Sequence, residues 1–207
     1  MGRLFKTTLM GALLAVMVAL GTAEAKADPV TFSTVTGSVF SASGTNVAVF
    51  ANINGTTTLT FNGTTNSVNT PAGTSFGDIV VSSTVPPGAT GPAVGGTFTL
   101  NITQIAPPGG PSALVGTLSG TLGFDTGIAT LTFATTSVTI GGFTYTVNPT
   151  YTIALPVTGV GGGAVTGTTT IQGTVTGGAV PEPTSMMLLG TGLLGVAGAV
   201  RKRFKRS

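Results

Sequence analysis

Apolar and polar residues alternate in short runs through the middle of the chain, and Gly or Pro ends almost every run. Such alternation is typical of half-buried β-strands bounded by turns. About ten strands with frequent turns favour an all-β domain, a β-sandwich or jelly-roll-like pair of sheets. Besides two hairpins, the pattern predicts strands at Val30–Val39, Ile79–Val85, Thr97–Ile105, Ala113–Leu122, Ala129–Phe133, Tyr151–Val157 and Thr168–Val175.

The first predicted hairpin has Asn54-Gly55 at its tip. This pair is preferred in two-residue type I′ turns. Counting outward from the turn sets Phe50 opposite Leu59 and Ala48 opposite Phe61, all on one face. We expect that face to belong to the core.

The second predicted hairpin has Gly141-Gly142 at its tip, because both glycines accept the positive φ of a type I′ turn. The same counting sets Ile140 opposite Phe143 and Val138 opposite Tyr145. The threonines between these residues then take the other, polar face.

The N-terminus has the three parts of a secretory signal peptide. Arg3 and Lys6 precede an apolar stretch, Leu9–Leu20, and small residues follow it. We expect signal peptidase to cleave after Ala27, with Ala25 at the other small-residue position, or alternatively after Ala25. A retained membrane anchor is a further alternative, although the apolar stretch is shorter than the ~20 residues of a spanning helix.

All eight Lys and Arg residues lie near the two ends of the chain. Between residues 28 and 180 the ionised side chains are Asp28, Asp78 and Asp125. Binding to nucleic acid needs a basic face that neutralises phosphates, so nucleic acid is excluded as a partner. The chain has no Cys, which also excludes disulfides and zinc thiolate sites.

Two motifs suggest chemistry at first sight. Phe124–Gly127 contains Asp-Thr-Gly, half of a site in which two carboxylates share a proton. Asp78 lacks this sequence context, so a dyad on Asp125 requires two copies of the chain, and an Asp-x-Gly turn is the alternative. Gly159–Ala164 matches a dinucleotide-binding pattern, but the Thr-rich stretch after it predicts no helix, so a glycine-rich loop is the interpretation.

Other catalytic arrangements lack their partners. The chain has no His, and residues 28–180 have no Lys, Arg, Glu or Cys to activate a serine nucleophile. Calcium at Asp78 or Asp125 would have one carboxylate per site and bind weakly, so we interpret both as solvated turn aspartates. The chain is therefore expected to be no enzyme and to hold no cofactor or metal.

The aromatic residues are mostly at strand positions and predict core rather than a sugar-stacking surface. Tyr145 and Tyr151 are the better candidates for a half-exposed binding surface, because a phenol has a polar tip. The predicted core phenylalanines are Phe32, Phe40, Phe50, Phe61, Phe76, Phe98, Phe124, Phe133 and Phe143.

The C-terminus combines a stiff tetrapeptide, an apolar run and a basic cluster. Pro181 and Pro183 keep the residues before them, including Glu182, out of the α region, so Val180–Pro183 is pre-extended. The apolar run from Met186 to Val200 predicts a short transmembrane helix. The positive-inside rule keeps the basic cluster cytoplasmic, and its members are Arg201, Lys202, Arg203, Lys205 and Arg206. An ordinary membrane anchor explains the helix and cluster but not the tetrapeptide.

At these residues the chain resembles the bacterial PEP-CTERM proteins, which are exported substrates of exosortase. The resemblance covers residues 181–207, with Pro-Glu-Pro, the Gly- and Leu-rich helix and the basic end in the family's order; only Phe204 interrupts the basic run. It implies that an exosortase-like membrane protease recognises Pro181, Glu182 and Pro183. The family shares this segment across many different domains, so the resemblance implies destination and not activity.

The sequence therefore predicts a signal peptide at 1–27, a β-sandwich domain at 28–176 and a sorting segment at 177–207. The expected partners are the Sec translocon, signal peptidase, the inner membrane and the exosortase-like protease. We expect an exported, non-enzymatic protein of the cell surface or extracellular matrix, held transiently in the inner membrane. The alternative is an adhesive or carbohydrate-binding module whose partner is extracellular polysaccharide.

Overall fold

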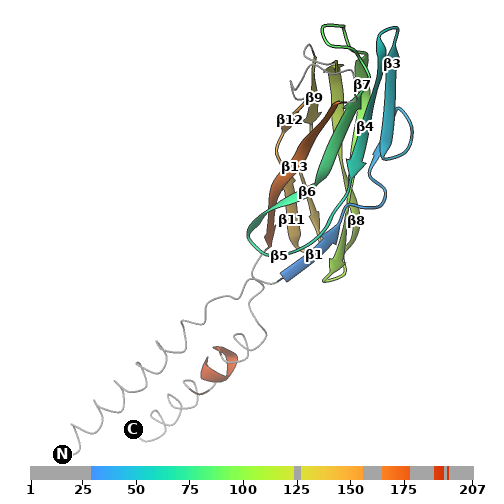
Figure 1. Cartoon of the computed structure of the whole chain (residues 1–207). Coiled ribbons are helices and arrows are strands. Elements are labelled where there is room, and N and C mark those ends of the chain that lie inside the picture. The colour runs from blue at the N-terminus through green and yellow to red at the C-terminus, as the bar shows by residue number, and fades with distance from the viewer. Residues whose placement is uncertain (1–28, 124–126, 156–164, 178–188, 194, 196–207) are drawn as a thin grey trace, which may run out of the picture. The chain divides into compact units, whose positions relative to one another are not determined.

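The computed structural model describes residues 29–123, 127–155, 165–177, 189–193 and 195. Residues 27–178 form one compact unit, the β unit, and this unit contains all the described strands (Figure 1). The strands are β1 (Pro29–Ser33), β2 (Val39–Phe40), β3 (Val47–Asn52), β4 (Gly55–Asn62), β5 (Thr65–Asn69), β6 (Ala72–Ser83), β7 (Ala93–Ala106), β8 (Gly110–Thr121), β9 (Ile128–Phe133), β10 (Ser137–Ile140), β11 (Phe143–Val147), β12 (Thr150–Ala154) and β13 (Val165–Gly177).

The strands form two sheets. Sheet A has the order β12-β9-β8-β7-β1-β5, with β2 also paired to β7, and sheet B has the order β10-β11-β13-β6-β4-β3. Neighbouring strands are antiparallel in both sheets, as in the β7–β8 and β6–β13 pairs. The chain passes repeatedly between the sheets, so residues far apart in sequence meet in one core. The prediction of an all-β fold is confirmed.

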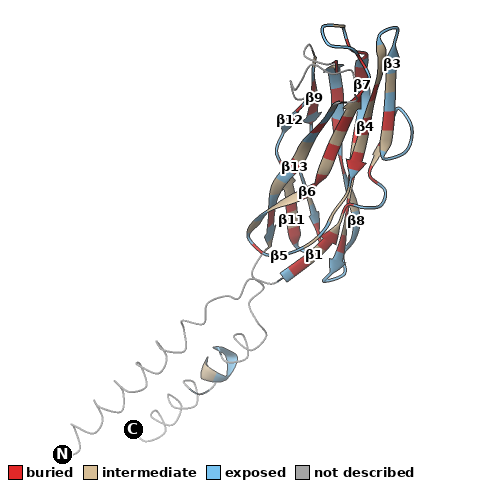
Figure 2. Ribbon diagram, in the orientation of Figure 1, coloured by how far each residue is buried: buried red, intermediate tan, exposed pale blue. Residues whose placement is uncertain are grey.

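Aromatic rings from both sheets meet in this core. Phe98 of β7 in sheet A lies 4.9 Å from Phe40 and 5.0 Å from Phe61 of sheet B, measured between ring centroids. Phe32 of sheet A lies 5.2 Å from Phe76 and 5.4 Å from Tyr145, both of sheet B. Buried and exposed positions alternate along the strands (Figure 2). The two sheets thus pack face to face through their apolar faces.

The hairpin at Gly141-Gly142 is confirmed in register. Ile140 pairs with Phe143 and Val138 with Tyr145. Gly141 has a φ of 56° and Gly142 a φ of 85°, so both occupy the region that a type I′ turn requires. A purely local signal was sufficient here.

The register predicted for the hairpin at Asn54-Gly55 is wrong by two residues. Ala48 pairs with Leu59 and Asn52 with Gly55, so the turn is Ile53-Asn54 and Gly55 begins β4. The Asn52 Oδ1 accepts a hydrogen bond from the Asn54 N–H at 2.9 Å, which stabilises this turn. Because the shift is an even number of residues, the core-facing residues of β3 and β4 keep their face.

The single strand predicted over Val30–Val39 is also wrong, because β1 ends at Ser33 and β2 begins at Val39. The chain turns between them: the Thr34 hydroxyl points inward and donates to the Phe76 carbonyl at 2.7 Å. Strand β5 was missed, and β6 begins at Ala72 rather than Ile79. The other predicted strands are present with shifted ends; the end predicted at Val157 lies outside the described residues.

The signal peptide predicted at residues 1–27 lies outside the described residues, and so does most of the transmembrane helix predicted from Met186 to Val200. Residues 189–193 are helical, and this segment belongs to a second unit made of residues 1–26 and 179–207. Within the described parts of the chain, no helix has the length and hydropathy needed to cross a bilayer.

Candidate functional site

The internal carboxylate Asp78 lies within β6 and not in a turn, so its interpretation as a turn aspartate is wrong. It pairs across the sheet with Thr170 of β13, whose hydroxyl donates to the Asp78 Oδ1 at 2.7 Å. Asp125, with its Asp-Thr-Gly motif, lies outside the described residues, as does the glycine-rich stretch at 159–164. No cluster of three or more His, Cys, Asp or Glu side chains occurs in the described part of the chain.

The two tyrosines are buried, so neither forms the half-exposed binding surface for which they were the better candidates. The Tyr145 hydroxyl donates to Gln104 Oε1 at 3.0 Å inside the core, and burial raises the pKa of Tyr145 to about 12. The Tyr151 hydroxyl donates to the Gln172 carbonyl and accepts from the Asn148 N–H at 2.9 Å. Burial raises the pKa of Tyr151, and these two backbone hydrogen bonds oppose that rise.

The phenylalanines are core residues, as predicted, wherever the structure describes them. Phe50 is the only half-buried one among the described residues, and Phe124 lies outside them. The buried ones are Phe32, Phe40, Phe61, Phe76, Phe98, Phe133 and Phe143. The described surface therefore presents no aromatic platform on which a sugar ring could stack.

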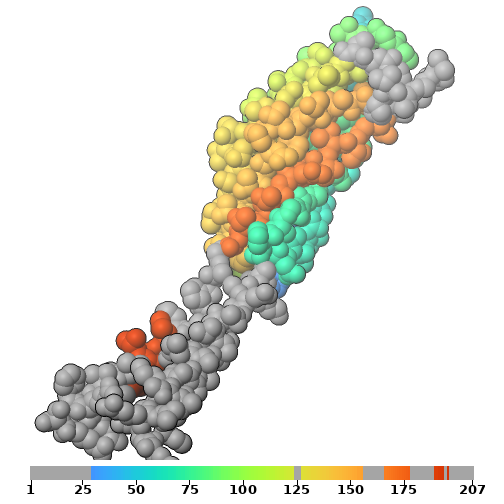
Figure 3. Space-filling model, turned by 90° about the vertical axis from the view of Figure 1, so that its left-hand side faces the viewer, coloured from blue at the N-terminus to red at the C-terminus, as the bar shows by residue number. Residues whose placement is uncertain are grey.

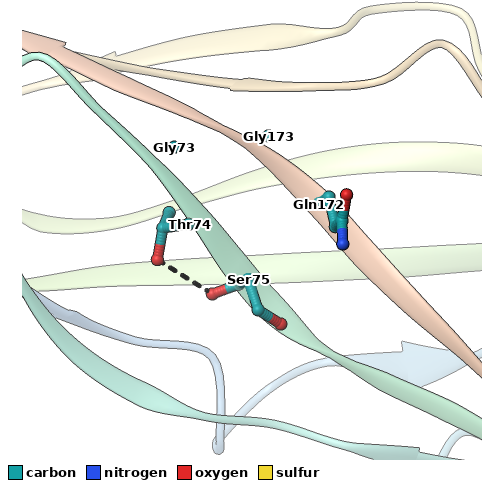
Figure 4. Close-up of a pocket in the computed structure, with 5 residues that line it drawn as sticks. All are labelled: Gly73, Thr74, Ser75, Gln172 and Gly173. Atoms are coloured by element: carbon teal, nitrogen blue, oxygen red, sulfur yellow. Dashed lines mark hydrogen bonds between the residues drawn. The ribbon is translucent and has the colours of Figure 1, made fainter.

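A shallow depression of about 340 Å³ lies on sheet B where β6 and β13 run side by side (Figure 4). Its lining is neutral: Gly73, Thr74 and Ser75 of β6 and Gln172 and Gly173 of β13. The glycines leave it open, and Gly173 admits no other residue, since an added Cβ would sit 1.9 Å from the Thr146 carbonyl oxygen. Hydroxyl, amide and backbone groups give this depression hydrogen-bonding capacity but no acid–base chemistry.

A β-bulge adjoins this depression. The register of β6 against β13 shifts between Thr170 and Gln172, because Phe76 and Gly77 together oppose Ile171. Gly77 has a φ of 120°, and a Cβ there would lie 2.6 Å from the Asn62 carbonyl oxygen. The extra residue lets Phe76 and Ile79 both face the core, although their positions differ by three, which would put them on opposite faces of a regular strand.

The outer side of sheet A carries an ordered group of hydroxyls, here called the hydroxyl face. Thr97, Thr117, Thr132 and Thr150 are direct cross-strand neighbours on β7, β8, β9 and β12, and all four are exposed. Ser119, Thr130 and Thr152 form the adjacent row. Neighbouring strands are about 4.8 Å apart, so these seven hydroxyls form a closely spaced two-row array.

This array has only a weak signal in the amino-acid sequence. The T-x-T pairs at 130–132 and 150–152 are visible in the sequence, but their alignment depends on the register of four strands. In Figure 3 the orange residues of β13 lie between the teal residues of β6 and the yellow and amber residues of β9 to β12. The Thr169 hydroxyl of β13 donates to the Thr152 carbonyl at 3.2 Å, which joins the edge of this array to sheet B.

The predicted processing residues lie outside the described residues. These are Ala25 and Ala27 for signal peptidase, Pro181, Glu182 and Pro183 for sorting, and Arg201, Lys202, Arg203, Lys205 and Arg206 for the basic cluster. Their individual roles stay predictions. Residues 179–203 match the family model of the PEP-CTERM protein-sorting motif, and this range contains the Pro-Glu-Pro sequence and the start of the basic cluster. No curated protein and no solved structure matches the chain.

Proposed function

We infer from residues 179–203, which make this chain a PEP-CTERM sorting-motif protein, that it is exported and processed by an exosortase-type membrane protein. The motif implies a transient membrane stage before release or transfer of the β unit. We propose that the delivered product is a non-enzymatic β-sandwich protein of the cell surface or extracellular matrix. The sorting motif is the single observation that carries this proposal.

The chemistry of the β unit supports a structural role. Residues 29–177 contain Asp78 and Asp125 but no His, Lys, Arg, Glu or Cys, so a hydroxyl nucleophile has no nitrogen base beside it. Asp78 is engaged with Thr170 through a hydrogen bond of 2.7 Å. A neutral surface rich in hydroxyls suits a hydrated polymer matrix, where charge would bring salt-dependent binding.

The proposal is tested by replacing Pro181 and Pro183 with Ala and following the mass and location of the chain in an exosortase-containing host. The two prolines pre-extend the tetrapeptide, so their loss should leave an unprocessed, membrane-associated precursor. The matched control replaces Pro86 and Pro87, an exposed pair of prolines in the β unit. Unchanged processing of the Pro181/Pro183 variant would overturn the recognition role.

A second candidate function is binding of neutral polysaccharide, and the hydroxyl face favours it. Seven hydroxyls in two rows offer donors and acceptors at the spacing of the strands, without competing charge. The described residues present no aromatic stacking surface, so binding would depend on these hydroxyls.

The test is saturable binding of the processed protein to a glycan array. Thr117→Val together with Thr132→Val keeps the shape of each side chain and removes two central hydroxyls, so binding should fall several-fold. Thr166→Val together with Thr168→Val on β13 of sheet B is the matched control, because both residues are exposed. Equal loss in both variants, or no saturable binding by the unmodified protein, would reject this function.

A further inference from the structure

The four lateral edges of the two sheets are not equally protected. At the β12 edge, the Thr152 carbonyl accepts a hydrogen bond from the Thr169 hydroxyl of sheet B. At the β5 edge, the Asn66 side-chain amide donates to the Ser75 carbonyl of β6 at 2.7 Å. Strand β10 is only four residues long. Strand β3, with six residues at the end of sheet B, is the longest edge strand in the part of the chain that the structure describes.

The free side of β3 has a short run of open backbone groups. The Phe61 N–H donates to the Asn46 carbonyl at 2.8 Å, and alternation from that pair directs the backbone groups of Ala48 and Phe50 toward β4. Val47, Val49 and Ala51 then direct theirs toward the free side. Val47 is already engaged, because its carbonyl accepts from the Thr45 hydroxyl at 2.9 Å and its N–H donates to the same oxygen at 3.2 Å. Val49 and Ala51 form the open segment.

The usual protection of an edge strand is missing at this place. Natural edges carry Lys, Pro or inward charges that prevent pairing with another sheet. The segment from Val47 to Asn52 is uncharged and has no Pro, and neither sign of charge is common anywhere in residues 29–177. The Val49 side chain is 60% exposed, and Ile53 at the adjacent turn is 99% exposed. An uncharged edge of this kind is complementary to a second copy of itself.

The half-buried Phe50 fixes how two such edges would align. Phe50 is on the inner side of β3, packed against the core but not covered by it. Suppose that the β3 strands of two copies pair antiparallel, with Phe50 of one copy opposite Phe50 of the other. Val49 of each copy then forms backbone hydrogen bonds with Ala51 of the other copy, so all the open backbone groups are paired. It also sets the two Phe50 rings opposite each other, where cross-strand aromatic pairs stabilise sheets.

We propose that two copies of this chain associate through β3, antiparallel and in this register, so that their B sheets become one continuous sheet. The contact is isologous and closes on itself, which limits the assembly at this edge to a pair. The proposal does not depend on processing of the C-terminal segment, because every residue it uses lies within β3 and its turn.

The register is tested by disulfide trapping in the full chain, purified in mild detergent. The chain has no Cys, so each variant carries one thiol. A hydrogen-bonded antiparallel pair has Cα atoms about 5.5 Å apart, within disulfide range. A mixture of Val49→Cys and Ala51→Cys chains should therefore give a cross-linked dimer several-fold faster than either variant alone.

The matched control is a mixture of Val115→Cys and Ala113→Cys chains. These residues have the same spacing and are exposed, but β8 is an interior strand of sheet A. Equal cross-linking of this control would reduce the result to random collision and overturn the proposal. So would equal cross-linking of Val49→Cys alone, or no cross-linking of the mixture when circular dichroism shows both variants folded.

A charge at the edge provides an independent measurement. Val49→Lys should reduce co-purification of two differently tagged full chains several-fold, because Lys on an edge strand opposes pairing with another sheet edge, and the antiparallel register would set the two introduced ammonium groups on one face of the joined sheet. Val115→Lys introduces the same charge at a similarly exposed interior-strand position and should leave co-purification unchanged. Equal co-purification of Val49→Lys and the unmodified chain would overturn the proposal.

Discussion

The sorting segment and the β unit encode their properties in opposite ways. In residues 179–203 a tetrapeptide and its flanks suffice for a family match. In residues 29–177 the informative features arise from strands far apart in sequence, such as the row from Thr97 to Thr150. The charges divide in the same way, since all Lys and Arg lie outside the β unit. A sorting signal is recognised by another protein as a short local segment. The arrangement of side chains on the surface of a β-sheet, by contrast, depends on the register of all its strands.

The largest effect is expected when the sorting segment alone is transferred to another protein. Residues 177–207 fused to an unrelated exported β-domain should bring processing of that domain in an exosortase-containing host, because recognition is local. The same fusion with Pro181→Ala and Pro183→Ala serves as the control and should remain full length. Mass spectrometry of the exported chains checks both. A fusion that stays intact would show that the β unit contributes to recognition and would break the comparison.

The next effect concerns the core that both sheets share. Phe98→Ala should lower the free energy of unfolding by about 3–5 kcal/mol, because Phe98 is fully buried and contacts Phe40 and Phe61. Urea unfolding followed by circular dichroism measures the loss. Val115→Ala, at an exposed strand position, is the control and should change stability by less than about 1 kcal/mol. Similar losses for the two variants would contradict the shared core.

A smaller effect is expected at the buried polar pair. Tyr145→Phe removes the donor to Gln104 Oε1 and leaves that acceptor unpaired, which should cost about 1–3 kcal/mol. Adding Gln104→Met removes the acceptor as well, so the double variant should lose less than the sum of the two single losses. Additive losses in this cycle would mean that the hydrogen bond contributes nothing.

The smallest effect is the response to pH. The β unit has no His, Lys, Arg, Glu or Cys, so its unfolding midpoint should be nearly constant from about pH 5 to pH 9. The pKa of Tyr145 is about 12 in the folded state and close to 10 when unfolded. The stability linked to this raised pKa is fully present below pH 10 and is lost as pH rises toward 12. Tyr145→Phe should make the alkaline decline shallower in urea titrations, and an equally steep decline would contradict the assignment.

The success of sequence reasoning depended on how far each determinant lies along the chain. The turn at Gly141-Gly142 was predicted in register because both glycines act locally. The turn near Gly55 was not, because the side-chain amides of Asn52 and Asn54 both donate to the Thr90 carbonyl, at 2.8 and 2.9 Å. That loop lies more than thirty residues away, and nothing in the local sequence indicates its contact.

The candidate sites follow the same rule. Tyr145 was a better candidate for a half-exposed binding surface than the phenylalanines, because a phenol has a polar tip. Its acceptor is instead Gln104, 41 residues earlier in the chain. The hydroxyl face needed four strands in register before its T-x-T pairs became an array. The sorting signal needed only its own residues, so it could be identified from the sequence.

The bulge at Gly77 changes which positions of β6 face the core. Before it the core-facing position is Phe76, with an even number, and after it the core-facing positions are Ile79 and Val81, with odd numbers. Polar substitutions in β6 should therefore be tolerated at odd-numbered positions before Gly77 and at even-numbered positions after it. Deletion of Gly77 would leave only Asp78 between Phe76 and Ile79, so regular alternation would keep Phe76, Ile79 and Val81 on the core face and would remove the bulge. An insertion or deletion of one residue elsewhere in β6 would turn the residues on one side of it to the opposite face of the sheet.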